Sequence, residues 1–238
     1  MTRPIVIGHR GAPVDAPENT MLSFQRAIQV GADMIELDIR ETTDGHLICL
    51  HDEDVSRTTD GEGTVSELTL TEVRSLDAGQ GEKIPLLEEV LDFAKGRISV
   101  NMDLKVFDYE EQILRLVEKR GMVGTVIASS FYQMTLEAMR ELSTEIRTAI
   151  LVEHDASDSV RDAIRIEANA INPKFNILTD EIIHETHGAG LSVFPWTVNS
   201  EESMTSLLKR EVDGLITDDP AKAVQIVKTL LNAEHAKP

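Results

Sequence analysis

The sequence predicts an α/β fold, a (β/α)8 TIM barrel in which eight parallel strands are each followed by a helix. Two observations lead to this prediction. Short apolar, β-branched runs alternate with amphipathic helical stretches along all 238 residues, with no low-complexity segment, long linker or change of composition. The length also suits such a barrel, which typically has about 250 residues. We therefore expect one barrel domain over residues 1–238.

The predicted strands form two groups. Nine segments have the composition of strands, and they cover residues 5–8, 34–40, 47–51, 98–104, 125–129, 147–152, 170–172, 191–196 and 214–217. Residues 41–46 leave no room for a crossover helix, so the segment at 47–51 must run antiparallel to its predecessor as a β-hairpin extension. The remaining eight strands are then parallel, which is the number in a barrel.

Helices are expected between these strands, and several are followed by glycine at or near the C′ position, as with Gly31, Gly96 and Gly121. The expected helices cover residues 20–30, 86–95, 108–120, 132–142, 157–168, 180–189, 201–210 and 221–232. The irregular segment 52–83 contains one short expected helix, at 70–76. We expect it to form a small insertion at the carboxyl-terminal mouth of the barrel, where chemistry collects in this fold.

The expected hairpin brings acidic and imidazole groups together. Asp44-Gly45 is a dipeptide favoured in two-residue hairpin turns. A turn centred on it places Asp38 opposite His51, with Glu36 on the same face of the ribbon.

Three polar residues, Asn101, Asp103 and Lys105, alternate with apolar residues in one predicted barrel strand. A barrel strand is covered on both sides, so a polar row needs a functional reason. Asp103 would join Glu36 and Asp38 as oxygen ligands of a hard divalent cation, Mg²⁺ or Ca²⁺. Lys105 would direct positive charge toward a phosphate.

Two histidines at strand ends suit acid-base chemistry near neutral pH. A lone histidine is often a hydrogen-bonded core residue, but His9 precedes Arg10 and Gly11, and His51 has the predicted place across from Asp38.

Further candidates come from the other strand ends. Glu18 is either a ligand, an orienting partner of Arg10, or a capping carboxylate before the following helix. Trp196 could wall a substrate pocket or close the core, and Phe131, Ser130 and Lys174 are candidate pocket residues.

Composition limits the partners. The net charge of −19 opposes binding to nucleic acid or to an anionic bilayer, so we expect a small-molecule substrate and no stable membrane association. The single cysteine, Cys49, cannot form an internal disulfide, and no signal-peptide pattern is evident, so we expect a cytoplasmic protein. The sequence leaves a homo-oligomer open.

A series of motifs resembles the glycerophosphodiester phosphodiesterases over nearly the whole chain. In order they are HRG at 9–11, PENT at 17–20, ELDI at 36–39, TDG at 43–45, HD at 51–52, RTTDG at 57–61, IPLLEEVL at 84–91, WTVN at 196–199 and TDDP at 217–220. The resemblance implies a barrel that binds a divalent cation through Glu36, Asp38 and the acid at position 103, with His9 and His51 as the acid-base pair. The family usually carries glutamate where this chain has Asp103.

Three functions are considered. The first, implied by the resemblance, is metal-dependent hydrolysis of glycerophosphodiesters to glycerol 3-phosphate and an alcohol, a reaction of lipid and glycerol metabolism. Arg10 and Lys105 would share the phosphate charge, with His9 on the nucleophile side and His51 on the side of the leaving alcohol. The nucleophile is water or a neighbouring glycerol hydroxyl, and the resemblance favours Trp196 as a wall of the alcohol pocket. The second is a lysophospholipase D-like activity, which would need a lipid-facing patch, and no exposed aromatic cluster is expected from the sequence. The third is a non-catalytic phosphoester-binding barrel, which both histidines and the three carboxylates argue against.

Overall fold

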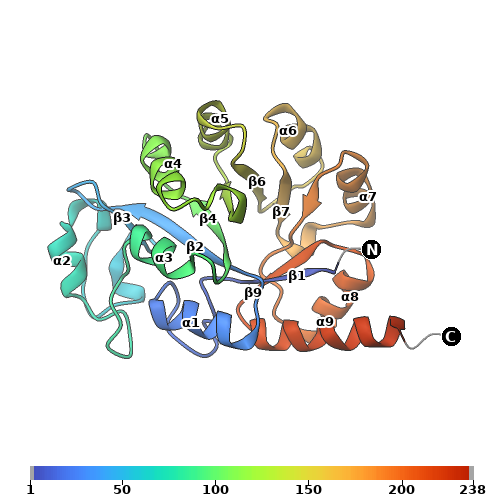
Figure 1. Cartoon of the computed structure of the whole chain (residues 1–238), viewed down its shortest axis with the longest axis horizontal. Coiled ribbons are helices and arrows are strands. Elements are labelled where there is room, and N and C mark those ends of the chain that lie inside the picture. Colours follow the sequence, from blue (N-terminus) through green and yellow to red (C-terminus); the bar gives the residue numbers. More distant parts are fainter. Residues whose placement is uncertain (1–2, 236–238) are drawn as a thin grey trace.

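The computed structural model describes residues 3–235 and has the predicted barrel architecture (Figure 1). Eight strands pair in parallel in the order β8-β7-β6-β5-β4-β2-β1-β9, and β3 pairs antiparallel with β2. The strands are β1 (Ile5–Gly8), β2 (Met34–Glu41), β3 (Leu47–Cys49), β4 (Ser99–Leu104), β5 (Val126–Ser130), β6 (Arg147–Val152), β7 (Ala170–Pro173), β8 (Ser192–Val193) and β9 (Gly214–Thr217).

The helices cover the outside of the barrel. Figure 1 shows α4 to α7 along one side and α1, α8 and α9 along the other. Their bounds are α1 (Met21–Val30), α2 (Leu70–Ser75), α3 (Leu87–Ala94), α4 (Glu110–Lys119), α5 (Gln133–Leu142), α6 (Ser159–Arg165), α7 (Asp180–Gly188), α8 (Glu201–Lys209) and α9 (Pro220–His235). No helix in the described range has the length and apolar character needed to cross a membrane.

Side-chain caps determine where several helices begin. The Thr20 hydroxyl accepts a hydrogen bond from Ser23 N at 3.2 Å, and Ser200 accepts one from Ser203 N at 3.0 Å. Each bond satisfies a backbone donor that the first turn leaves unpaired. Gly31 ends α1 in the left-handed conformation, as its place after the helical pattern predicted.

Strand β8 is much shorter than the expected 191–196. Phe194 N and Trp196 N still donate to β7 at 3.0 Å each, but Pro173 has no N–H to return a bond, so the ladder is incomplete there. Backbone hydrogen bonds still cross from β9 to this segment, from Asp213 N to Val193 O at 3.2 Å and from Ile216 N to Pro195 O at 3.0 Å. The barrel is therefore nearly closed.

A layer of apolar side chains fills the barrel interior. It comprises Ile7, Met34, Ile127, Ala149, Ala170, Phe194 and Ile216. Side chains two residues apart on a strand share a face, so the next inward residue along each strand lies toward the carboxyl-terminal mouth. His9 follows Ile7 in this way, and Glu36 follows Met34. Polar groups at the mouth thus rest on an apolar floor.

The hairpin register differs by one residue from the prediction. Ile39 pairs with Cys49 and Arg40 with Ile48, which aligns Asp38 with Leu50 and not with His51. The turn has a left-handed φ of 80° at Gly45 but not at Asp44, whereas a two-residue type I′ turn needs both. The result is a loop one residue longer, of the kind that a type I turn and a following glycine form.

The segment 52–83 forms a small insertion beside β3, with the 3-10 helices η1 (Val55–Arg57) and η2 (Val65–Glu67) preceding α2 (Figure 1). It has an apolar cluster of its own, built from Ile48, Leu50, Val55, Val65, Val73, Ala78 and Ile84. Two members of this cluster, Ile48 and Leu50, come from the second arm of the hairpin. The hairpin extension is therefore the base on which the insertion packs.

Candidate active site

A cavity of about 220 Å³ lies at the carboxyl ends of the strands, and every predicted site residue lines it except Glu18, Ser130 and Lys174. The lining residues are His9, Arg10, Glu36, Asp38, His51, Asn101, Asp103, Lys105, Ser129, Phe131, Leu151, Glu153, Trp196 and Ile216. Sequence reasoning did not single out Ser129, Leu151 or Glu153. The two-residue spacing from the interior layer, from Ile127 to Ser129 and from Ala149 to Leu151, could have identified them.

Three buried carboxylates lie together at the floor of this cavity. Glu36, Asp38 and Asp103 offer oxygen atoms within 4.8 Å of one another. Strands β2 and β4 are neighbours in which Asp38 is the register partner of Asp103. The Oδ1 atoms of Asp103 and Asn101 are buried without a hydrogen-bond partner among the described residues. A set of oxygen donors with such an unpartnered atom fits a hard divalent cation.

Two segments from outside strands β2 and β4 orient these carboxylates. Arg10 N donates to Glu36 Oε2 at 2.8 Å, and Asn19 Nδ2 donates to Asp38 Oδ2 at 2.7 Å. Asn19 is therefore part of the site and not only a residue before a helix. Gly11 allows the close approach of this loop, because a Cβ there would lie 2.4 Å from Ser23 Oγ.

Two cationic side chains, Lys105 and Arg10, partly neutralise the carboxylates. Lys105 Nζ lies 2.5 Å from Asp103 Oδ2 and 3.2 Å from Asp38 Oδ1. Arg10 Nε lies 3.3 Å from Asp38 Oδ2. Three carboxylates facing two cations leave an excess of negative charge in the cavity.

The pKa values reflect that excess. Burial and the charge of Asp38 raise the pKa of Glu36 to about 7. Burial also raises the pKa of Asp103 to about 6, although Lys105 opposes the shift. Burial alone would raise the pKa of Asp38, but Lys105 and Arg10 outweigh it and lower this pKa to about 2. Asp38 is therefore the carboxylate that stays ionised, and the other two hold charge at a cost.

Each of the two cavity histidines, His9 and His51, has an aspartate oxygen at hydrogen-bond distance from its Nδ1 atom. His9 Nδ1 lies 2.6 Å from Asp218 Oδ1, and His51 Nδ1 lies 2.5 Å from Asp52 Oδ1. The hydrogen bond from Arg57 outweighs the effect of burial and lowers the pKa of Asp52 to about 2, so the Asp52 oxygen accepts and the ring nitrogen of His51 donates. The same argument applies to Asp218, whose pKa is also lowered. Nε2 is thus the nitrogen left for chemistry in both rings.

The two imidazoles differ in proton affinity. Burial alone would lower the pKa of His9, but the hydrogen bond to Asp218 and the charge of Glu36 outweigh it and raise this pKa. Burial lowers the pKa of His51, and the charge of Arg10 lowers it further against the effect of Asp38. An acid and a base in one site require such a difference.

A chain of ion pairs connects the insertion to the cavity. Arg57 Nε contacts the Asp52 carboxylate, and the Arg57 guanidinium donates two hydrogen bonds to Glu18, at 2.9 and 2.7 Å. Glu18 Oε1 also accepts from Arg10 Nη1 at 2.8 Å. Both oxygens of Glu18 are therefore occupied. Of the alternatives that the sequence left open, the geometry fits an orienting partner of Arg10.

Ser130 and Lys174 do not line the cavity. Ser130 Oγ donates to Leu104 O at 2.7 Å and is buried between strands. Lys174 Nζ lies 3.1 Å from Oε1 of Glu153, which lines the cavity, but Lys174 itself is not among the lining residues.

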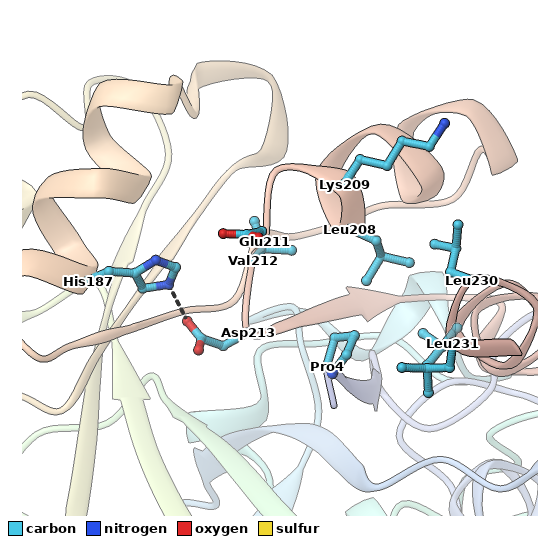
Figure 2. Close-up of a pocket in the computed structure, with 10 residues that line it drawn as sticks. Pro4, His187, Leu208, Lys209, Glu211, Val212, Asp213, Leu230 and Leu231 are labelled. Atoms are coloured by element: carbon cyan, nitrogen blue, oxygen red, sulfur yellow. Dashed lines mark hydrogen bonds and ion pairs between the residues drawn. The ribbon is translucent and has the colours of Figure 1, made fainter. Parts of the chain in front are cut away.

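A second cavity, of about 350 Å³, lies at the opposite end of the barrel, beside Pro4 before β1 and Asp213 before β9 (Figure 2). Its walls are largely apolar, with Leu208 among them. His187 Nε2 lies 3.0 Å from Asp213 Oδ2, which also accepts a hydrogen bond from Val193 N at 2.8 Å. This pair joins α7, β8 and β9, so it is explained by the fold alone.

Comparisons with known proteins point to one family. The model of the glycerophosphoryl diester phosphodiesterase family matches residues 9–222. A glycerophosphodiester phosphodiesterase of Caldanaerobacter subterraneus subsp. tengcongensis is 36% identical over 239 residues, covering 95% of this chain and 98% of that relative. A glycerophosphodiester phosphodiesterase structure from Agrobacterium tumefaciens has a TM-score of 0.83 at 29% identity, covering 92% and 98% of the two chains. A phosphodiesterase of Oleispira antarctica in complex with the product sn-glycerol-3-phosphate has a TM-score of 0.88 at 27% identity, covering 94% and 97%.

We expect Glu36→Gln to stabilise the cation-free protein at pH 8. The folded-state pKa of about 7 lies above the ordinary value of 4.5, so the destabilising effect of the Glu36 charge grows between these pH values and is complete above them. Urea unfolding with chelator should show a gain of about 1–3 kcal/mol. Asp38→Asn is the matched control and should destabilise, because Asp38 is the carboxylate that Lys105 and Arg10 hold charged. A Glu36→Gln protein less stable than the parent would contradict this account of the charges.

Proposed function

This chain belongs to the glycerophosphoryl diester phosphodiesterase family and is a phosphoric diester hydrolase, and from that premise we propose that it hydrolyses glycerophosphodiesters with a divalent cation and two histidines. The products are glycerol 3-phosphate and an alcohol. The observation that carries the proposal is the convergence of two imidazoles, three carboxylates, Arg10 and Lys105 on one cavity.

The charge balance of the cavity supports a bound divalent cation. Three carboxylates face only two cationic side chains, Arg10 and Lys105, so the cavity without a cation repels a phosphodiester anion. Glu36, Asp38 and Asp103 would hold Mg²⁺ or Ca²⁺, which supplies charge stabilisation for the non-bridging phosphate oxygens. Lys105 and Arg10 then share the remaining phosphate charge, since they also line the cavity.

The histidines supply and remove protons. One Nε2 takes the proton of the attacking hydroxyl, of water or of a glycerol hydroxyl, as its oxygen bonds to phosphorus. The other Nε2 gives a proton to the alcohol oxygen as its bond to phosphorus breaks. Asp218 and Asp52 act as positioning residues, because each holds the ring whose Nε2 reacts. Asn199 in turn orients Asp218 by donating to its Oδ2 atom at 2.6 Å.

The pKa directions bear on the order of these proton transfers. In the cation-free protein they favour His51 as the proton acceptor and His9 as the donor, the reverse of the order favoured by the sequence. A cation on Glu36 cancels one of the causes that raise the pKa of His9. The pH profile of the cation-loaded enzyme therefore decides the order.

We expect His9→Ala and His51→Ala each to lower kcat on glycerophosphocholine by about 10² to 10⁴. The parent, stripped with chelator and reloaded with Mg²⁺ or Ca²⁺, should release glycerol 3-phosphate, measured by a coupled assay. Both variants should melt near the parent, because each histidine is outside the apolar clusters.

The matched control is His154→Ala, since His154 lies after β6 at the mouth but its side chain is 89% exposed. It should retain the activity of the parent. A parent with no activity on any glycerophosphodiester would refute the proposal. A His9 or His51 variant with full turnover would refute the acid-base role of that histidine.

Asp103 is the site at which this chain differs from the pattern of the family. If Asp103 is a direct ligand, Asp103→Asn should weaken cation binding at least about tenfold, and Asp103→Glu should restore it or shift the preference between Mg²⁺ and Ca²⁺. Calorimetric titration of both cations into the three proteins measures this. Equal dissociation constants across all three would remove Asp103 from the ligand set.

A further inference from the structure

Arg57 is a cationic side chain of the insertion that contacts partners of the active-site residues without lining the cavity itself. It opens the RTTDG run at 57–61 and belongs to η1. Its guanidinium contacts two carboxylates, because Nε contacts Asp52 while Nη1 and Nη2 donate to the two oxygens of Glu18, at 2.9 and 2.7 Å. The planar fork of arginine suits such a double contact, and the single ammonium of lysine does not reproduce it. One side chain therefore holds two carboxylates in a fixed relation.

Each of these carboxylates holds one residue of the cavity. Asp52 Oδ1 lies 2.5 Å from His51 Nδ1, and Glu18 Oε1 accepts from Arg10 Nη1 at 2.8 Å. His51 is one of the two proposed acid-base groups, and Arg10 is one of the two proposed phosphate-binding side chains. Arg10 follows β1 and His51 follows β3, so they come from different segments of the chain. Arg57 is thus a bridge between a group that moves a proton and a group that holds the phosphate.

The backbone of Arg57 is supported by the insertion. Val55, two residues earlier, is fully buried in the apolar cluster of the insertion. Val55 N donates to Gly63 O at 3.0 Å, and the Asp54 side chain caps η1 by accepting from Ser56 N at 2.8 Å. The place of the guanidinium is therefore set by the insertion and not by the two cavity residues that it links.

The bridge orders side chains more than it stabilises the fold. The Arg57 side chain is 46% exposed, and ion pairs so accessible to water stabilise proteins only weakly. Burial alone would raise the pKa of Glu18, but the hydrogen bond from Arg57 and the charge of Arg10 outweigh it and lower this pKa. The pKa of Asp52 is lowered too, so both carboxylates stay ionised acceptors for the groups that they orient.

Resting on the proposed function, we propose that Arg57 is a positioning residue that keeps Nε2 of His51 and the guanidinium of Arg10 aligned on one phosphodiester. It acts through Asp52, which fixes the ring of His51, and through Glu18, which fixes Arg10. A misplacement of reacting groups by about 1 Å can cost about 10² in rate. Loss of Arg57 should therefore lower kcat and kcat/KM together, because the alignment is needed in the transition state.

The kinetic test compares Arg57→Gln and Arg57→Lys with the parent on glycerophosphocholine at saturating Mg²⁺ or Ca²⁺. We expect Arg57→Gln to lower kcat about 10- to 100-fold, with KM within about threefold of the parent. Arg57→Lys keeps the charge but loses the fork, so it should still lower kcat by more than about fivefold. Full kcat in Arg57→Lys would show that charge alone suffices and would overturn the positioning role.

Arg74→Gln is the matched control within the insertion. Arg74 joins α2 to α3, because its Nη1 donates to Glu89 Oε2 at 2.6 Å, and neither residue lines the cavity. Its removal should leave kcat within about twofold of the parent. Equal losses in Arg74→Gln and Arg57→Gln would mean that any loosening of the insertion lowers activity, which would contradict a specific role of Arg57.

A double-variant cycle tests the path through His51. In the His51→Ala background, Arg57→Gln should lower kcat at least about threefold less than it does in the parent, because the ring that it positions is gone. Losses that multiply in full would show that Arg57 does not act through His51.

Spectra of the imidazole separate this inference from the proposed function. Burial lowers the pKa of His51, so the ring is neutral at pH 8, and its ¹⁵N signals, assigned by their loss in His51→Ala, report which nitrogen carries the proton. The parent should show the proton on Nδ1, and Arg57→Gln should show a mixture of the two tautomers, whether or not turnover occurs. Identical signals in both proteins would overturn the role of Arg57. A parent without hydrolysis, in which the tautomer still depends on Arg57, would count against the proposed function alone.

Discussion

The pairing of β2 with β4 is the constraint on which the site depends. Parallel register sets Asp38 beside Asp103, and the two-residue alternation adds Glu36 on the same face. Carboxylates this close and this deeply buried repel one another, which the raised pKa of Glu36 expresses. The chain keeps them together with Lys105, Arg10 and the buried barrel around them. The proposed divalent cation would reverse the sign of the cavity charge.

The barrel and the insertion have separate tasks around this centre. The interior apolar layer supports the inward residues at the strand ends. The proposed catalytic side chains are therefore held by the barrel strands themselves. The insertion contributes Arg57, which contacts both Asp52 and Glu18. Asp52 orients His51 and Glu18 orients Arg10, so Arg57 links the two. The loops after β4 and β5 add an apolar surface at the edge. The proposed chemistry thus lies at the strand ends, and the loops surround it.

Alternation and strand count were readable from the sequence because they are local properties. Nine strands, the inward face of Asp103 and the floor of the cavity followed from them. The hairpin register was wrong, since loop length depends on the conformation of Asp44, which Asp-Gly alone does not determine. Asp218 as the partner of His9 lies 209 positions away, and no local pattern indicates it. Side-chain exposure is likewise a property of the assembled mouth, so the exposed pair of Phe107 and Tyr132 appeared only in three dimensions.

The central claim is that the carboxylates hold charge at a cost that a cation relieves, and proton release on cation binding tests it most directly. Glu36 and Asp103 have raised pKa values, about 7 and about 6, so near pH 6.5 they are partly protonated without the cation. Binding must displace those protons. Titration of Mg²⁺ or Ca²⁺ in two buffers of different ionisation enthalpy should therefore show proton release near pH 6.5 that vanishes near pH 8.5. Equal heats in both buffers near pH 6.5 would contradict the account.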